Sequence, residues 1–179
     1  MDGVTLREIQ RPLKDRYRAD PAKALVTLRA EGSLASSEVA CSVATGRALV
    51  EAGLHPATGG DGNLACSGDM LLQALVACAG VTLRSIATAR GLDVSGTVRA
   101  EGDLDFRGTL GVDPEAPVGF RSIRLILELD STATEEQLDE LIATTERYCV
   151  VYQTLRSSPQ TSAVITRTGG ADGRPSDHR

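Results

Sequence analysis

The sequence of 179 residues has no tryptophan, only three Tyr and two Phe, and no excess of positive charge. Nineteen Lys and Arg stand against 24 Asp and Glu, which gives a net charge of −5. Binding to nucleic acid usually requires a basic stripe or aromatic side chains that stack on bases. We therefore predict a protein that does not bind nucleic acid.

Long apolar segments and export signals are also missing. The longest apolar candidate is interrupted by Gln73, Thr82 and Arg84 before it reaches the ~18 residues of a membrane span. The N-terminal residues Met1 to Gln10 are polar and lack the apolar core of a signal peptide. We expect a single soluble, cytoplasmic domain with reduced thiols and no membrane partner.

Metal and phosphate motifs are absent as well. The cysteines form no Cys-x-x-Cys pair and the sequence has only two histidines, whereas structural zinc sites usually take their ligands in close pairs. The Gly-rich stretch at residues 59–63 lacks the lysine of a phosphate-binding loop. We expect no metal and no cofactor. Three interpretations are left for Cys41, Cys66, Cys78 and Cys149: buried inert thiols, redox groups, or a mixture of the two.

The pattern along the chain divides it into an arm, a domain and a tail. Residues 1–20 have the helical spacing of a basic arm, which Pro12 should interrupt or kink, and we expect this arm to pack on its own domain or on a partner subunit. Residues 21–167 form the domain. Residues 168–179, rich in Gly, Asp, Arg and Ser, are typical of a disordered tail.

Alternation of apolar and polar residues predicts strands in two groups. The first group, between Lys23 and Ala52, comprises two or three antiparallel strands with turns near residues 31–33 and 45–46, and it places Cys41 in the core. The second group and a final strand are predicted at residues 94–105, 106–112, 118–130 and 162–167.

A long helix is predicted from Asp69 to Arg90. Ser67 is its expected N-cap and Gly91 its end. Apolar residues cover most of its circumference, so this helix should be buried on nearly every side. Such burial requires a sheet or a second chain around the helix.

A second helix opens at the capping box formed by Thr134 and Gln137. Apolar residues at spacings of three and four carry it to Leu155 and place Cys149 on its core side. The order of strands, buried helix, strands and helix predicts an α+β fold with one cysteine on each main helix.

The two helical cysteines lie in a distinctive sequence context. The segment Asp69-Met-Leu-Leu-Gln-Ala-Leu-Val-Ala-Cys78-Ala-Gly-Val-Thr-Leu-Arg84, followed further along by Glu146-Arg-Tyr-Cys149, resembles the two cysteine motifs of the OsmC/Ohr family. The order of elements from Lys23 to Arg167 is also similar to that family. The resemblance implies two antiparallel sheets around buried central helices in an intertwined homodimer.

The resemblance also implies a function. Members of the family are cysteine-dependent peroxidases that reduce organic hydroperoxides. By that resemblance Cys78 is the peroxidatic nucleophile, Cys149 is the resolving thiol, and an external dithiol is the reductant. Neither a metal nor an organic cofactor is implied.

Some positions depart from the family pattern. Better-characterised members carry a Glu nine or ten residues before the first cysteine, paired with an Arg that supports the thiolate, but this sequence has Asp69 and Gly68 there. On a straight helix Asp69 points away from Cys78 and lies ~13 Å along the axis. It is expected to position an arginine beside the other subunit's site, or to act as a charge near the helix cap.

The supporting arginine has two candidates, of which we prefer Arg29 to Arg47. Val150 stands where many relatives have Pro after the second cysteine, a change that retains the resolving thiol. In the loop before the long helix, Cys66 can be a disulfide partner and His55 a base. Both are expected to have no such role, since Cys66 is not part of the common family motif and His55 has no identifiable partner.

A non-enzymatic relative that binds a hydrophobic small molecule or senses thiol-reactive species is the alternative function. The missing Glu favours that alternative, whereas the two retained cysteines favour the peroxidase. The scarcity of aromatic residues predicts an aliphatic pocket, which suits an alkyl hydroperoxide more than a sugar or nucleotide.

Overall fold

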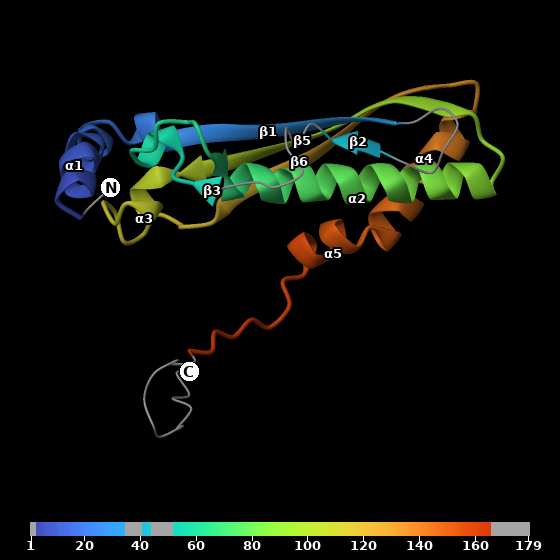
Figure 1. The fold of residues 1–179 in the computed structure, drawn as a ribbon. Helices are drawn as coiled ribbons and strands as arrows, with labels where there is room; N and C mark the ends of the chain where they lie inside the picture. The colour runs from blue at the N-terminus through green and yellow to red at the C-terminus, as the bar shows by residue number, and fades with distance from the viewer. Residues whose placement is uncertain (1–2, 35–40, 44–51, 166–179) are drawn as a thin grey trace.

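The structure, a computed structural model, describes residues 3–34, 41–43 and 52–165. At residues 3–7, 28–34 and 41–43 it describes the backbone alone. Figure 1 shows the long helix α2 lying along one face of a sheet. The helices are α1 (Gly3–Ala19), α2 (Ser67–Ala89), α3 (Phe106–Thr109), α4 (Glu135–Tyr148) and α5 (Val150–Arg156), with short 3-10 turns η1 (Pro21–Ala24) and η2 (Pro56–Thr58). The strands are β1 (Leu25–Leu34), β2 (Cys41–Val43), β3 (Ala52–Gly53), β4 (Ala65–Cys66), β5 (Val94–Asp105) and β6 (Phe120–Ser131).

The main sheet has four antiparallel strands in the order β2-β1-β5-β6. Alternation along β5 places Val98 and Ala100, both fully buried, on the face covered by α2. Arg99 points to the other face, where it forms an ion pair of 2.8 Å with Glu128 of β6. One face of the sheet is therefore apolar and packed, and the other is polar.

Of the two antiparallel sheets that the resemblance implies, the described residues of the chain contain one. Besides the four-stranded sheet, the described residues contain one pair of two-residue strands, β3 and β4, and these run parallel. The single chain therefore covers α2 with one antiparallel sheet, while α4 and α5 pack on α2 as well.

Helix α2 has nearly the predicted bounds, but it begins at Ser67, so Cys66 and not Ser67 is its N-cap. Its predicted burial on nearly every side, which was to need a sheet or a second chain, is not reached within the single chain. The apolar side chains of Met70, Leu71 and Val81 are 37%, 38% and 41% exposed, and they lie at helical spacing along one stripe. The chain leaves this stripe of α2 uncovered.

By length and composition, α2 alone among the described helices is long and apolar enough to cross a membrane. The polar residues Gln73, Thr82 and Arg84 do not lower the hydropathy of this helix below that of a membrane span, as we had expected them to. Core helices of soluble proteins meet the same criterion. In this structure α2 packs against β1 and β5 of the sheet.

The second predicted helix is divided in two. Its start is confirmed, because Thr134 caps α4 and forms the reciprocal capping box with Gln137. Its predicted run through Cys149 is wrong, since the extended backbone of that residue (φ −71°, ψ 107°) ends α4 and caps α5. Cys149 is nevertheless fully buried, as the spacing predicted.

Long-range pairing explains one further correction in the strands, and a local helix cap explains another. The turn predicted at residues 31–33 lies inside the continuous strand β1, which pairs with β5 from Leu25↔Asp105 to Ser33↔Thr97. The strand predicted at 106–112 begins with the short helix α3, because the Asp105 side chain accepts a hydrogen bond from the backbone N–H of Arg107. The described part of the predicted strand at 162–167 contains neither helix nor strand.

The N-terminal arm is an uninterrupted helix, so the break predicted at Pro12 is wrong. Contacts on both sides of that proline tie α1 to the segment around η2. Tyr17 is buried and donates a hydrogen bond of 2.7 Å to the carbonyl of Ala57, and Gln10 donates one of 3.2 Å to the carbonyl of Thr58. Tertiary docking thus retains the helix despite the hydrogen bond lost at proline.

Candidate active site

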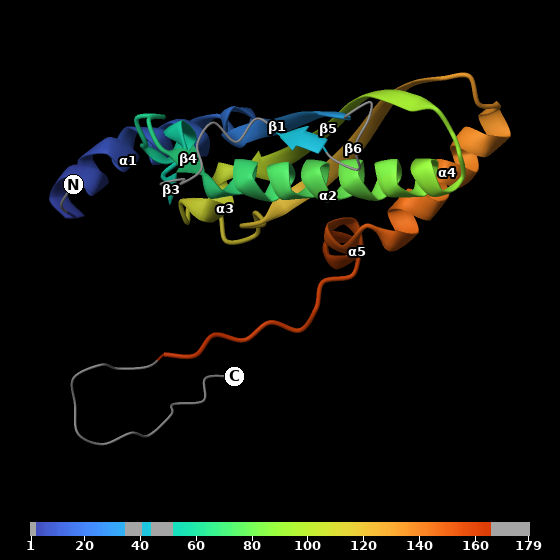
Figure 2. The ribbon, with the colours of Figure 1, turned by 45° about the vertical axis from the view of Figure 1, so that its right-hand side comes forward.

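The structure brings Cys78 and Cys149 together. Cys78 lies in the middle of α2, and Cys149 occupies the junction between α4 and α5. Figures 1 and 2 show α5 beside the central part of α2 in both views. The two thiol groups are hydrogen-bond partners.

Cys149 is the buried member of this pair. Its Sγ accepts a hydrogen bond of 3.5 Å from the backbone N–H of Tyr152, as an N-cap side chain of α5 does. Burial raises the pKa of the Cys149 thiol, and its hydrogen bond with Cys78 raises this pKa further, whereas the Tyr152 N–H lowers it. The net effect raises the pKa of Cys149 to about 11. At neutral pH Cys149 is a protonated thiol that donates to its neighbour.

Cys78 has the opposite character. Burial raises the pKa of its half-buried thiol, but four hydrogen-bond donors together outweigh that effect and hold the pKa below its ordinary value. These donors are the backbone N–H of Val151, the thiol of Cys149, the backbone N–H of Val150 and the hydroxyl of Thr82. The geometry therefore favours a thiolate at Cys78 and a thiol at Cys149.

Local backbone geometry explains why these N–H groups are available. The first N–H groups of a helix have no partner within that helix. Because Cys149 interrupts the helix, α5 begins at Val150 and presents the N–H groups of Val150 and Val151 toward α2. Thr82 lies one turn after Cys78 on α2, so its hydroxyl approaches the same sulfur atom.

These donors were not identified from the sequence. The sequence offered two signals for them: Thr82 lies four residues after Cys78, and position 150 is not a proline. Neither signal is specific, because the contacts depend on how α5 packs against α2.

Asp69 lies apart from the thiol pair, near the start of α2. Burial raises the pKa of its carboxyl, and the charge of His55 opposes that shift. The Nδ1 atom of His55 accepts a hydrogen bond of 3.0 Å from Ala57, and its ring stacks on Phe106 at 5.0 Å. His55 thus caps η2 and packs on α3, away from the thiols.

The two candidate arginines differ in what the structure describes. Arg29 lies in β1, where its backbone pairs with that of Glu101, and its side chain is outside the described part of the chain. Arg47 lies wholly outside the described residues. Among the other cysteines, Cys41 is in β2 with its backbone alone described.

Cys66 cannot reach Cys78 within one chain. It caps the N-terminus of the continuous helix α2, about 18 Å along the axis from Cys78. A disulfide requires Cα atoms about 4.4 to 6.8 Å apart. Among the cysteines whose side chains the structure describes, Cys149 is the one that lies beside Cys78.

No group of three or more His, Cys, Asp or Glu side chains within the described ranges is arranged to hold a metal ion. The chemistry that this part of the chain offers is that of a paired thiolate and thiol. Such a pair can attack an electrophile and then form a disulfide.

Comparison with known proteins agrees with the fold. The family model described as OsmC-like protein matches residues 60–163. A crystal structure of an OsmC-like hydroperoxide resistance protein from Jannaschia sp. CCS1 is similar to this chain with a TM-score of 0.55 and 18% sequence identity, over 86% of this chain and 99% of that one. No curated protein matches the chain. Because the family match spans more than half of the sequence, the chain belongs to the OsmC-like family.

Proposed function

We propose that the chain is a cysteine-dependent peroxidase that reduces organic hydroperoxides in the cytoplasm. The observation that carries the proposal is the hydrogen-bonded pair of Cys78 and Cys149, whose pKa values move in opposite directions. The hydroperoxide resistance named for the similar Jannaschia protein supports it. The catalytic domain would span residues 21–167, with residues 1–20 as its arm.

The first step is an attack by the Cys78 thiolate on the distal oxygen of the hydroperoxide. A sulfur–oxygen bond forms, the oxygen–oxygen bond breaks, and the alkoxide that leaves takes up a proton to become an alcohol. Cys78 is oxidised to a sulfenic acid and the peroxide is reduced. The lowered pKa of Cys78 supplies the thiolate that this step needs.

The second step resolves the sulfenic acid. Cys149 gives up its thiol proton and attacks the sulfur of Cys78, so that a disulfide forms and the hydroxyl group leaves with that proton as water. The hydrogen-bond contact between the two thiols supports this assignment. An external dithiol then reduces the disulfide by two exchange steps and restores both cysteines.

The backbone N–H groups of Val150 and Val151 and the hydroxyl of Thr82 support the thiolate in this scheme. Arg29 is proposed as the arginine that adds positive charge to the site. Asp69, whose position along α2 separates it from Cys78, is proposed to orient an arginine beside the second subunit's thiolate.

The protein is proposed to act as a homodimer. The exposed apolar stripe of α2 formed by Met70, Leu71 and Val81 supports this proposal, since such side chains are usually covered in the working assembly. Packing of two α2 helices along these stripes would place the sheets of the two subunits on either side of them.

The test is a peroxidase assay with cumene hydroperoxide and dithiothreitol. We expect Cys78→Ser to abolish consumption of the hydroperoxide, because the nucleophile is gone. Cys66→Ser is the matched control and should keep full activity. Retained turnover in Cys78→Ser would refute the peroxidase and favour a relative that binds small molecules or senses thiol-reactive compounds.

A further inference from the structure

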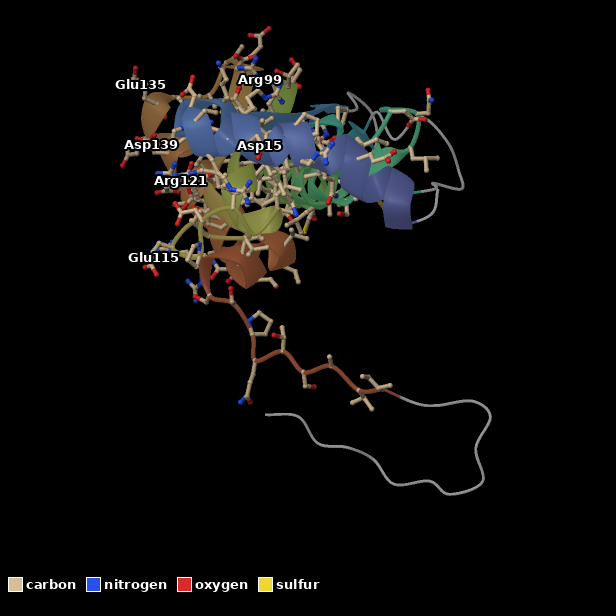
Figure 3. All side chains as sticks on the ribbon, turned by 90° about the vertical axis from the view of Figure 1, so that its left-hand side faces the viewer. Asp15, Arg99, Glu115, Arg121, Glu135 and Asp139 are labelled. Atoms are coloured by element: carbon tan, nitrogen blue, oxygen red, sulfur yellow. The ribbon has the colours of Figure 1, made fainter. Side chains whose placement is uncertain are left out.

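The last helix, α5, is held by few contacts. It has seven residues, none of them fully buried, and its partly buried side chains Val151, Tyr152 and Leu155 pack against the core. The described chain after it, residues 157–165, is exposed and contains neither helix nor strand. In Figures 1 and 3 this segment leads away from the rest of the molecule. Because a free helix shorter than about 12 residues is marginal in water, α5 requires its contacts with α2 and an N-terminal cap.

The N-terminal cap of α5 consists of sulfur atoms. The first backbone N–H groups of a helix find no acceptor within that helix. In α5, the N–H groups of Val150 and Val151 donate to the sulfur of Cys78. The N–H group of Tyr152 donates to the Sγ atom of Cys149 at 3.5 Å. The first turn of α5 is thus held by the two groups that the proposed reaction oxidises.

Oxidation weakens these acceptors. In the reduced pair Cys78 is favoured as a thiolate, and a hydrogen bond to a charged acceptor is about twice as strong as one to a neutral acceptor. A disulfide carries no charge, and neutral sulfur is a weak acceptor. The covalent bond between Cys78 and Cys149 also replaces the hydrogen bond between their thiol groups. The first turn of α5 therefore loses most of its cap when the disulfide forms.

Reduction of the disulfide requires access to one of its sulfur atoms. A dithiol attacks one sulfur and expels the other, and the sulfur whose thiol has the lower pKa leaves faster. Cys78, whose pKa is lowered, is the better leaving group, so attack on Cys149, whose pKa is raised to about 11, is the favoured route. Cys149 is fully buried while α5 is in place. The favoured route is therefore closed until α5 moves.

We infer that formation of the disulfide releases α5 from α2 and exposes the sulfur of Cys149, where the external dithiol attacks. The inference rests on the proposed peroxidase function and deepens it, because it assigns the entry of the reductant to the oxidised state of the protein.

The exchange then proceeds in two steps. One thiol of the dithiol loses its proton to solvent and bonds to the Sγ atom of Cys149, the bond between the two cysteines breaks, and Cys78 leaves as a thiolate. The second thiol of the reductant loses its proton and attacks the reductant sulfur bound to Cys149. Cys149 leaves and takes up a proton, and the dithiol is oxidised to a disulfide. The restored thiolate rebuilds the cap, and α5 docks again.

Hydrogen–deuterium exchange with mass spectrometry tests the release, in protein that carries Cys66→Ser. Diamide, a thiol-specific oxidant, forms the disulfide without a hydroperoxide. The readout is exchange at residues 153–157, where the N–H groups of Gln153 and Ser157 donate to backbone carbonyls and not to sulfur. We expect this exchange to be about tenfold faster in the oxidised protein, because two bonds to a charged acceptor are lost. Equal or slower exchange would overturn the inference.

Two controls accompany this measurement. The first two turns of α4 are the internal control, since Thr134 and Gln137 cap that helix without sulfur, and their exchange should not change. Cys78→Ser in the same background is the matched variant, because it cannot form the disulfide. Diamide should leave exchange at residues 153–157 of this variant unchanged. An increase equal to that of the parent protein would show that the disulfide is not the cause, and would overturn the inference as well.

The site of attack is read from a mixed disulfide. The oxidised protein is treated briefly with 2-mercaptoethanol, which has a single thiol, and is quenched in acid before peptide mapping. We expect the adduct on Cys149 and a free thiol at Cys78. An adduct on Cys78 with Cys149 free would refute the assignment of the attacked sulfur.

Failure of the proposed function has a separate signature, because diamide makes the disulfide without a peroxide. A protein that consumes no hydroperoxide but releases α5 after diamide treatment refutes the peroxidase and supports the redox-linked release. A protein that reduces hydroperoxide but keeps α5 protected in its oxidised form refutes the release alone.

Discussion

Replacing Val150 by proline removes one hydrogen bond to the Cys78 thiolate and little else. Proline has no backbone N–H, yet its fixed φ suits the first position of a helix, which Val150 occupies in α5. The Val150 N–H lowers the pKa of Cys78. Val150→Pro should therefore raise that pKa and shift the pH profile of Cys78 reactivity to higher pH.

The magnitude follows from the strength of the lost bond. A hydrogen bond to a charged group contributes about 1.5 to 3 kcal/mol, and the lower value applies to the half-exposed thiol of Cys78. This value corresponds to about tenfold less thiolate at a pH below the pKa. A more basic thiolate is also more nucleophilic, with a Brønsted coefficient of about 0.4 to 0.5, which restores about threefold. We expect Val150→Pro to react about threefold more slowly below the pKa of Cys78 and about threefold faster above it.

The assay measures the rate at which Cys78 reacts with a disulfide probe as a function of pH, in proteins that carry Cys66→Ser. Val150→Ala keeps the backbone N–H and is the matched control, with an unchanged profile. Circular dichroism checks that both variants retain their helices. Identical profiles for Val150→Pro and Val150→Ala would show that this N–H group does not support the thiolate, and the reasoning about α5 would be refuted.

Three other outcomes are expected. Cys149→Ser should consume one equivalent of hydroperoxide without reductant and keep a sulfenic acid at Cys78, which dimedone labels and mass spectrometry detects; absence of the label would contradict the resolving role. Val81→Asp should convert a dimer to a monomer in light scattering, since it puts a charge on the apolar stripe of α2, and a variant that stays a dimer would contradict the role of this stripe. Thr134→Ala should lower the free energy of unfolding by about 1 kcal/mol through loss of the capping box, and Thr134→Ser should not; equal stability of the two variants in urea denaturation would refute the cap.

Local signals in the sequence predicted the positions of helices correctly where those positions depend on residues close together in the sequence. The apolar pattern of α2 and the capping box at Thr134 gave element positions that the structure confirms within two residues. The break at Pro12 and the turn at residues 31–33 were wrong, because docking of Tyr17 and the long pairing of β1 with β5 override the local preference.

In the candidate site, too, some residues could be predicted from the sequence and others depend on tertiary packing. The two cysteines were identified by the resemblance of their motifs, and the burial of Cys149 on the core side followed from spacing. The N–H donors of Val150 and Val151 were not foreseen, because they arise where Cys149 interrupts the helix and α5 turns toward α2. The bulge at Arg121 likewise depends on the register between β5 and β6, which the pattern of one strand does not determine.

The central claim is that Cys78 and Cys149 form one redox pair. The most direct measurement is peptide mapping by mass spectrometry after the protein has been treated with one equivalent of cumene hydroperoxide and its free thiols have been blocked. The account predicts a disulfide-linked peptide pair that contains Cys78 and Cys149, with one equivalent of cumyl alcohol released and Cys66 blocked as a free thiol. Recovery of Cys78 as a blocked, unoxidised thiol would contradict the claim.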